Sequence, residues 1–247
     1  MRRFTPLRPD PRAPLARANP VAKLGAAAIL MAVLFMASGP VTPAVVLAGI
    51  LVSLPFTGLA VGTLLVRVWP LLLAALAVGV LNVVLAPASS GGPDFSAGLA
   101  LGLRLLGIAL SGVIAIATTD PTDLADSMQQ QAHLSPRLAV GVLAAIRMLP
   151  ILAVEWQLLG MARRARGVSA GRSPVAAARL AFGKLLALLV GAIRRATRLA
   201  LAMDARGFGA APFRTIARTQ RMRAADWGLL VAAVALGAAA LGIGSAL

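Results

Sequence analysis

Long, uncharged apolar blocks constrain this chain more than any other feature of its sequence. Two examples are LGAAAILMAVLFMA, which begins at Leu24, and LLLAALAVGVLNVVLA, which begins at Leu71. Hydrophobic residues make up 59% of the 247 residues, whereas only 13% are charged. A water-soluble domain of this length would need more charged surface, and a helix that spans a bilayer needs about 20 apolar residues. The sequence therefore predicts an all-α integral membrane protein.

The apolar blocks divide the chain into four regions. Residues 1–20 are rich in Arg and Pro and are expected to form an irregular arm. Residues 21–118 are expected to hold four membrane helices, of which the second contains Pro55 and Gly58 and is kinked or broken, and the third opens at Trp69 and Pro70. Residues 119–225 form a basic region, and residues 226–247 form one more apolar helix. The expected spans before the basic region are residues 21–38, 44–66, 69–86 and 95–118.

The distribution of basic residues sets the expected orientation. Six lie in or next to the N-terminal arm, whereas the loops at 39–43 and 87–94 have none. The positive-inside rule then places the N-terminus in the cytoplasm, with the last of about five spans ending outside the cell. The net charge of +16 has the same explanation, because the few aromatic residues are not interleaved with the basic runs as nucleic-acid stacking would require. We expect a multi-pass membrane protein with its N-terminus in the cytoplasm.

The basic region reads as long amphipathic helices. It contains 16 of the 24 Lys and Arg residues, yet long apolar stretches persist in it. On a helical wheel the bases of residues 174–206 fall within an arc of about 160° and the apolar residues fall on the other side. Residues 136–166 are similar in kind, with Arg147 and Glu155 inside. The bases in the arc are Arg179, Lys184, Arg194, Arg195 and Arg198.

Few residues suggest catalysis or metal binding. There is no Cys, the single His133 has no second ligand at metal spacing, and no GxxxxGK[ST] phosphate loop exists. We therefore expect no catalytic residue, no metal and no cofactor in this chain. Arg104 and Glu155 are the charges nearest to membrane depth, and either a functional role or a local ion pair or snorkelling remains open for them. A lipid-modifying enzyme would need a second acidic cluster besides Asp120, Asp123 and Asp126.

Two short motifs carry more information. In TTDPTDLADSM, Pro121 at the first helical position, Asp120 or Thr119 as N-cap and Asp123 in the first turn predict a helix start. Ala165-Arg166-Gly167 and Ala205-Arg206-Gly207 each follow a long helical run, and a glycine just past the last turn commonly ends a helix. Chance repetition is one explanation of the second motif. The other is that each helix end presents an Arg to one of two equivalent partners.

These residues resemble a known family, the transmembrane T component (EcfT, CbiQ and BioN-like proteins) of energy-coupling factor (ECF) importers. The resemblance rests on ARANPVAKL, TTDPTDLADSM, AIRMLPIL and the paired Ala-Arg-Gly motifs, and it covers nearly the whole chain. It implies that the long helices are coupling helices and that Arg166 and Arg206 contact two ABC ATPase subunits. Ala165 and Ala205 would allow close approach, and Gly167 and Gly207 would end the helices. The first copy continues Val168-Ser169 where the second has Phe208-Gly209, so the two contacts are expected to differ in detail.

The resemblance also implies a location in a bacterial cytoplasmic membrane, further partners and a non-catalytic role. ATP would be bound by the ATPases, and a small membrane protein would capture the substrate, a vitamin or a transition-metal ion. The alternative is a stand-alone permease whose own substrate site would use Arg104 and Asn82. The identity of the substrate is not encoded in any motif that we find.

Overall fold

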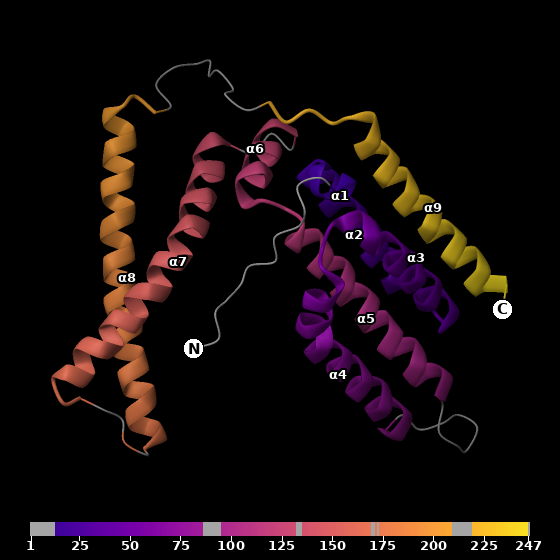
Figure 1. Ribbon diagram of the computed structural model, residues 1–247, viewed down its shortest axis with the longest axis horizontal. Coiled ribbons are helices and arrows are strands. Elements are labelled where there is room, and N and C mark those ends of the chain that lie inside the picture. The colour runs from indigo at the N-terminus through magenta and orange to yellow at the C-terminus, as the bar shows by residue number, and fades with distance from the viewer. Residues whose placement is uncertain are drawn as a thin grey trace. The chain divides into compact units, whose positions relative to one another are not determined.

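The computed structural model describes residues 13–85, 95–131, 135–168, 171, 173–208 and 219–246, and every regular element in these ranges is a helix (Figure 1). This confirms the all-α prediction. His133, the first 12 residues of the arm, Ser169 and Gly209 lie outside the described residues. The described part of the arm contains a short helix rather than irregular chain alone, because Pro14 opens a turn of helix.

The chain forms two compact units, which we describe separately. Unit 1 comprises residues 1–132 and 220–247, and unit 2 comprises residues 133–219. Residues 119–132 and 220–225, which we assigned to the basic region, therefore belong to unit 1. The helices of unit 1 are α1 (Pro14–Arg17), α2 (Pro20–Met36), α3 (Val41–Thr57), α4 (Val61–Leu85), α5 (Phe95–Ala117), α6 (Pro121–Gln131) and α9 (Ala224–Ala246). Those of unit 2 are α7 (Pro136–Ala165) and α8 (Pro174–Ala205).

The chain breaks at Gly58, as the prediction of a kinked or broken second helix allowed, and not before Trp69, where we predicted that the third helix begins. Helix α3 ends at Thr57, because Gly58 adopts the left-handed conformation with φ 67°. The Thr57 hydroxyl donates to Leu54 O at 2.6 Å and accepts from Leu59 N at 3.2 Å, which fixes the turn. Helix α4 then runs from Val61 straight through Pro70. The prediction of a helix start at Trp69-Pro70 was therefore wrong.

The core of unit 1 lies where α2, α3, α4, α5 and α9 pack on one another. Its buried residues come from helices far apart in the sequence, and their side chains are all aliphatic. Helix α9 contributes through Ala240, so the last apolar block returns to pack beside the first ones. The largest fully buried side chains of unit 1 are Leu34, Val46, Thr57, Pro43 and Ser127.

Helices α4 and α5 lie side by side and approach through glycine (Figure 1). A Cβ atom placed on Gly98 would overlap Val83 and would lie 2.7 Å from Gly79 O. A Cβ on Gly102 would lie 3.2 Å from Ala75 O. Gly98 and Gly102 form a GxxxG pattern, which allows close backbone approach between membrane helices. This motif was not recognised in the sequence.

Five described helices are long and apolar enough to cross a membrane, namely α4, α5, α7, α8 and α9. The number agrees with the predicted total of about five spans, but α7 and α8 take the place of α2 and α3. Helices α2 and α3 have 17 residues each, or about 25 Å, and fall just short of a bilayer core. Helix α7 is apolar over most of its length and basic at its end, so its polarity runs along the axis more than across it. The placement of α7 and α8 at the cytoplasmic surface stays a prediction.

Candidate functional site

The two helices of unit 2 begin in the same way. Ser135 precedes Pro136 in α7, and Ser173 precedes Pro174 in α8. Each serine is the N-cap, since its hydroxyl accepts a hydrogen bond from the backbone N–H three residues later, at 3.4 and 3.3 Å. Proline at the first helical position loses nothing there, because that N–H has no partner within the helix. The sequence showed both Ser-Pro pairs, and we had not recognised them as matched starts.

The end of α7 is a Schellman motif built on the first Ala-Arg-Gly. Gly167 adopts φ 75°, which favours glycine, and its N–H donates to Arg164 O at 2.9 Å. Val168 N donates to Arg163 O at 3.0 Å. These two bonds satisfy carbonyl groups that the last helical turn leaves unpaired. The prediction that Gly167 ends the helix is confirmed.

The end of α8 repeats this geometry at the second Ala-Arg-Gly. Gly207 has φ 72°, and its N–H donates to Asp204 O at 2.9 Å. Phe208 N donates to Met203 O at 3.0 Å. In both helices the arginine is the C-cap residue, with φ and ψ near −90° and 10°. The two motifs thus hold Arg166 and Arg206 in equivalent backbone positions.

Both arginines are exposed, and so are the alanine and glycine beside each of them. A guanidinium group offers five N–H donors in a planar fork that suits carboxylate and carbonyl acceptors. The two ends differ in charge, because Arg163 and Arg164 occupy the last turn of α7, whereas α8 has Asp204 there. Each end can donate several hydrogen bonds to a partner, from a more basic surface on α7 than on α8.

Helices α7 and α8 cross within unit 2 (Figure 1). Glu155 of α7 and Arg195 of α8 form an ion pair at the crossing, with Oε2 and Nη2 2.7 Å apart. Their side chains are 31% and 26% exposed, so the pair is partly shielded from water. Glu155 therefore has the local ion-pair role that was one of its two sequence interpretations.

Two further contacts hold the crossing. Lys184 Nζ lies 4.0 Å from the centroid of the Trp156 ring, a cation–π distance. Arg163 Nη1 donates to Leu180 O at 2.8 Å. A Cβ atom on Gly183 would lie 3.0 Å from the Arg163 guanidinium, so this glycine leaves room for it. Three basic side chains of the unit are thus engaged in fixing the two helices on each other.

The crossing lies at the same distance from both arginine-bearing ends. Arg166 follows Glu155 by 11 residues, and Arg206 follows Arg195 by 11 residues. At 1.5 Å per residue each end lies about 16 Å along its helix from the ion pair. The first half of α7 and the second half of α8 also enclose a groove of about 570 Å³, lined mostly by Ala, Leu and Met side chains.

The predicted helix start in TTDPTDLADSM is confirmed and lies in unit 1. Helix α6 begins at Pro121, and Asp120 is its N-cap, since Asp120 Oδ1 accepts from Thr122 N at 2.7 Å. Asp123 in the first turn accepts from Gln220 Nε2 at 3.3 Å. The structure therefore connects Asp123 with a residue after the α7–α8 segment.

A buried polar cluster in unit 1 was missed in the sequence. Lys23 is 5% exposed, and its ammonium group donates to Thr118 O at 2.7 Å and Ala16 O at 3.1 Å. Asp226 is 2% exposed and accepts from the backbone N–H groups of Asn19 and Arg223, both at 2.7 Å. The carboxylates of Asp123 and Asp226 interact electrostatically with Lys23. The Asn19-Pro20 pair is visible in ANPVAK, but nothing near it in the sequence indicates that Asp226 is the partner of Asn19.

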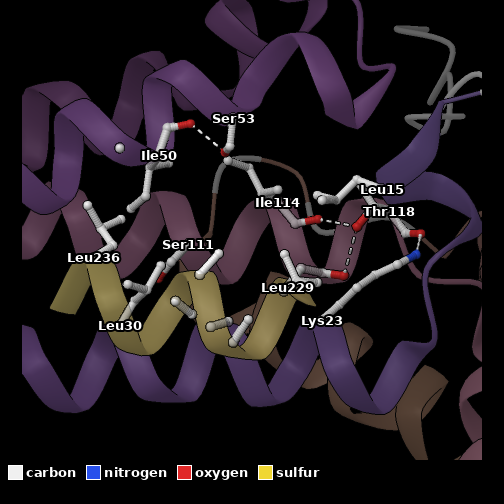
Figure 2. A pocket seen from close by; sticks show the side chains of 16 residues that line it. Leu15, Lys23, Leu30, Ile50, Ser53, Ser111, Ile114, Thr118, Leu229 and Leu236 are labelled. Atoms are coloured by element: carbon white, nitrogen blue, oxygen red, sulfur yellow. Dashed lines mark hydrogen bonds between the residues drawn. The ribbon is translucent and has the colours of Figure 1, made fainter. Parts of the chain in front are cut away.

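Figure 2 shows Lys23 at one edge of an apolar cavity of about 200 Å³ between α2, α3, α5 and α9. The hydroxyl groups in its lining are engaged by the backbone. Ser53 donates to Ile50 O at 2.7 Å, and Ser111 donates to Ile108 O at 2.9 Å. The lining is thus suited to apolar contacts.

Arg104 of α5 caps another helix. Its Nη2 donates to Ala37 O, the C-cap carbonyl of α2. A cation at a helix C-terminus is favoured by the helix dipole. The contact favours a structural role for Arg104 over a role as the centre of a substrate site, although its Nε atom is buried without a protein partner.

The fold and these helix ends define an all-α, multi-pass membrane protein that carries two matched arginine ends. Comparison with known proteins is consistent with that class. The family model "CbiQ: Cobalt transport protein" matches residues 11–216. The chain therefore belongs to the CbiQ family of cobalt transport proteins, which confirms the family resemblance in the sequence.

Curated relatives carry the name energy-coupling factor transporter transmembrane protein EcfT. The protein of Exiguobacterium sibiricum is 33% identical over 130 residues, covering 49% of each chain. That of Staphylococcus aureus is 31% identical over 139 residues, covering 52% of this chain and 51% of the relative. That of Bacillus subtilis is 30% identical over 149 residues, covering 57% and 56%. The chain thus spans about half the length of the curated relatives it matches.

Proposed function

We propose that this chain is the transmembrane coupling subunit of an ECF-type importer. In this proposal two ABC ATPase subunits bind the ends of α7 and α8, with Arg166 and Arg206 as the contact residues. ATP-driven movement of the ATPases passes through these helices to a substrate-capture membrane subunit. The imported substrate is a vitamin or a transition-metal ion. The chain itself is non-catalytic, and its N-terminus faces the cytoplasm.

The observation that carries the proposal is the repeated helix end. Two Schellman motifs place an exposed arginine at the same backbone position, and each arginine lies 11 residues beyond the ion pair that joins the helices. A single capped end is common in proteins of every class. Two matched ends on crossed helices suit two partners of one kind, as two ATPase subunits would be.

The contacts at the crossing support a mechanical role. The Glu155–Arg195 ion pair, the Lys184–Trp156 contact and the Arg163–Leu180 hydrogen bond join α7 to α8 between their ends. A displacement applied at one end is then transmitted to the other helix rather than absorbed by sliding. The apolar groove beside the crossing offers surface for the capture subunit.

The proposal predicts that the double substitution Arg166→Glu and Arg206→Glu releases the ATPases. A glutamate at each position would repel the carboxylate and carbonyl groups that the arginine binds. We therefore expect at least a tenfold loss of ATPases that co-purify with a tagged chain. The control is Arg179→Glu with Arg194→Glu, which changes the charge equally at two exposed positions of α8 away from its end.

Normal recovery of the ATPases with the end variant would exclude the proposed contact. Equal loss in both variants would mean that total charge, rather than the helix ends, governs association. Uptake of radioactive cobalt(II) and of tritiated biotin into vesicles then distinguishes the metal ion from the vitamin as substrate. Uptake by the chain alone would favour a stand-alone permease.

A further inference from the structure

The chain passes between its two compact units at two points, after Ala132 and before Gln220. On the unit 1 side these two points are hydrogen-bonded to each other. Gln131 Nε2 donates to Gln220 O at 3.0 Å, and Gln220 N donates to Gln130 Oε1 at 2.8 Å. The bonded residues are 89 and 90 positions apart in the sequence. The segment that contains α7 and α8 thus leaves unit 1 and returns to it at one place.

Helix α6 holds the returning segment at a second position. Gln220 Nε2 donates to Asp123 Oδ1 at 3.3 Å. Asp123 and Gln130 are seven residues apart, and residues at this spacing lie on one face of a helix. Gln220 is therefore bound along a face of α6 by its backbone N–H, its backbone carbonyl and its side chain. We call Gln130, Gln131 and Gln220 the glutamine clamp.

The clamp is continuous with the buried part of unit 1. Asp123 interacts electrostatically with the ammonium group of Lys23, which donates to the carbonyl that follows α5 at Thr118. On the returning side, Asp226 binds the backbone N–H of Asn19 at the start of α2. Both segments next to the clamp are thus anchored to membrane-region helices by buried charged groups.

We propose that the glutamine clamp positions α6 to receive the movement of α7 and α8. This inference rests on the proposed coupling function. If the two connections between the α7–α8 segment and unit 1 could move apart, their separation would absorb part of any displacement of α7 and α8. Two connections closed by hydrogen bonds move together, so the displacement reaches α6 and the core beyond it. The three glutamines are positioning residues and contact neither nucleotide nor substrate.

Two charge-matched variants test the clamp. Gln131→Glu removes the donor to Gln220 O and places a carboxylate against that carbonyl. Gln129→Glu makes the same charge change on α6, two residues away and outside the clamp. Each variant is assembled with the ATPases in proteoliposomes, and amide hydrogen exchange is measured with and without a non-hydrolysable ATP analogue. In the unaltered chain we expect the nucleotide to change exchange in α6 as well as in α7 and α8.

We expect Gln131→Glu to abolish the nucleotide-dependent change in α6 while α7 and α8 keep theirs, and Gln129→Glu to keep both. A change in α6 that survives in Gln131→Glu, or that never occurs in the unaltered chain, would overturn the clamp. No change in α7 and α8 of the unaltered chain would instead refute the proposed ATPase coupling.

A second variant covers the case in which Gln131→Glu does not fold. The chain has no Cys, so Gln131→Cys with Gln220→Cys supplies the sole pair of thiols. Closing this pair with a short bismaleimide should leave the nucleotide response of α6 intact, because a working clamp stays closed. Loss of the response on cross-linking would show that the two connections must separate, which contradicts the proposal.

Discussion

Asp226 shows how a single carboxylate joins distant parts of this membrane protein. Its two oxygens accept from the backbone N–H groups of Asn19 and Arg223, and the side chain is almost fully buried. Hydrogen bonds to a charged group are stronger than neutral ones, and a buried N–H without an acceptor is costly. Lys23 provides the compensating charge nearby. This one residue therefore joins the start of α9 to the start of α2.

At this scale we predict that Asp226→Asn lowers the stability of the chain. An amide has one oxygen, so one of the two N–H groups would face an NH₂ group and lose its acceptor. The cost should be about 2 kcal/mol, measured as earlier thermal unfolding in detergent. Asp204→Asn, the same change at an exposed position of α8, should leave the unfolding temperature unchanged. Equal shifts for the two variants would contradict the structural account.

Helix pairs in this protein approach each other through glycine, in two different ways. Helices α4 and α5 pack backbone against backbone at Gly79, Gly98 and Gly102. In the crossing of α7 and α8, Gly183 instead makes room for a guanidinium group. Membrane helices gain little from apolar burial against lipid, so close packing of this kind contributes much of their association.

At the element scale we predict opposite effects of one substitution at two glycines. Gly98→Ala should destabilise the α4–α5 pair by about 1–3 kcal/mol, because the added methyl group meets Val83 and Gly79 O. Gly62→Ala in α4 has open space around the Cβ and should stabilise the helix by up to about 1 kcal/mol. Unfolding of both variants in the same detergent gives the comparison, and a stabilising Gly98→Ala would contradict the packing.

Local chemistry explains which elements the sequence could predict. Pro121 with Asp120 and the two Arg-Gly ends are decided within one helical turn, and their starts and stops were predicted at the right residues. The break of the second helix occurs at Gly58, one of the two residues that predicted it, whereas Pro70 was weighed wrongly, because a proline inside a membrane helix is tolerated where neighbouring groups compensate. The partners of Lys23, Arg104 and Gln131 come from distant positions, and one sequence has no signal for such pairings.

At the scale of the whole molecule, the chain leaves unit 1 after α6, forms α7 and α8, and returns to unit 1 before α9. The ends of that segment are hydrogen-bonded at Gln131 and Gln220, so unit 1 is closed without it. The buried groups of unit 1 also come from its own residues, from α2 to α9. Unit 1 should therefore be able to fold independently of unit 2.

At this scale we predict that residues 132–219 are replaceable. A Gly/Ser linker of about six residues, a common connection length, should join Gln131 to Gln220 without strain. The shortened chain should insert into membranes and elute as a single species in detergent, with an unfolding temperature close to that of the full chain. Aggregation of the shortened chain beside a well-behaved full chain would show that unit 1 depends on α7 and α8.

The equal spacing of Arg166 and Arg206 from the ion pair has a consequence for stoichiometry. A half-turn about an axis that passes midway between Glu155 and Arg195, perpendicular to the line joining them, would exchange the two helices and match the number of residues from the ion pair to each arginine. The proposal of two ATPase partners thus requires only one copy of this chain, because each helix presents its arginine at the same number of residues from the ion pair. If the two proposed partners differ, we expect the residues that follow the glycines, Val168 and Phe208, to distinguish the two helix ends.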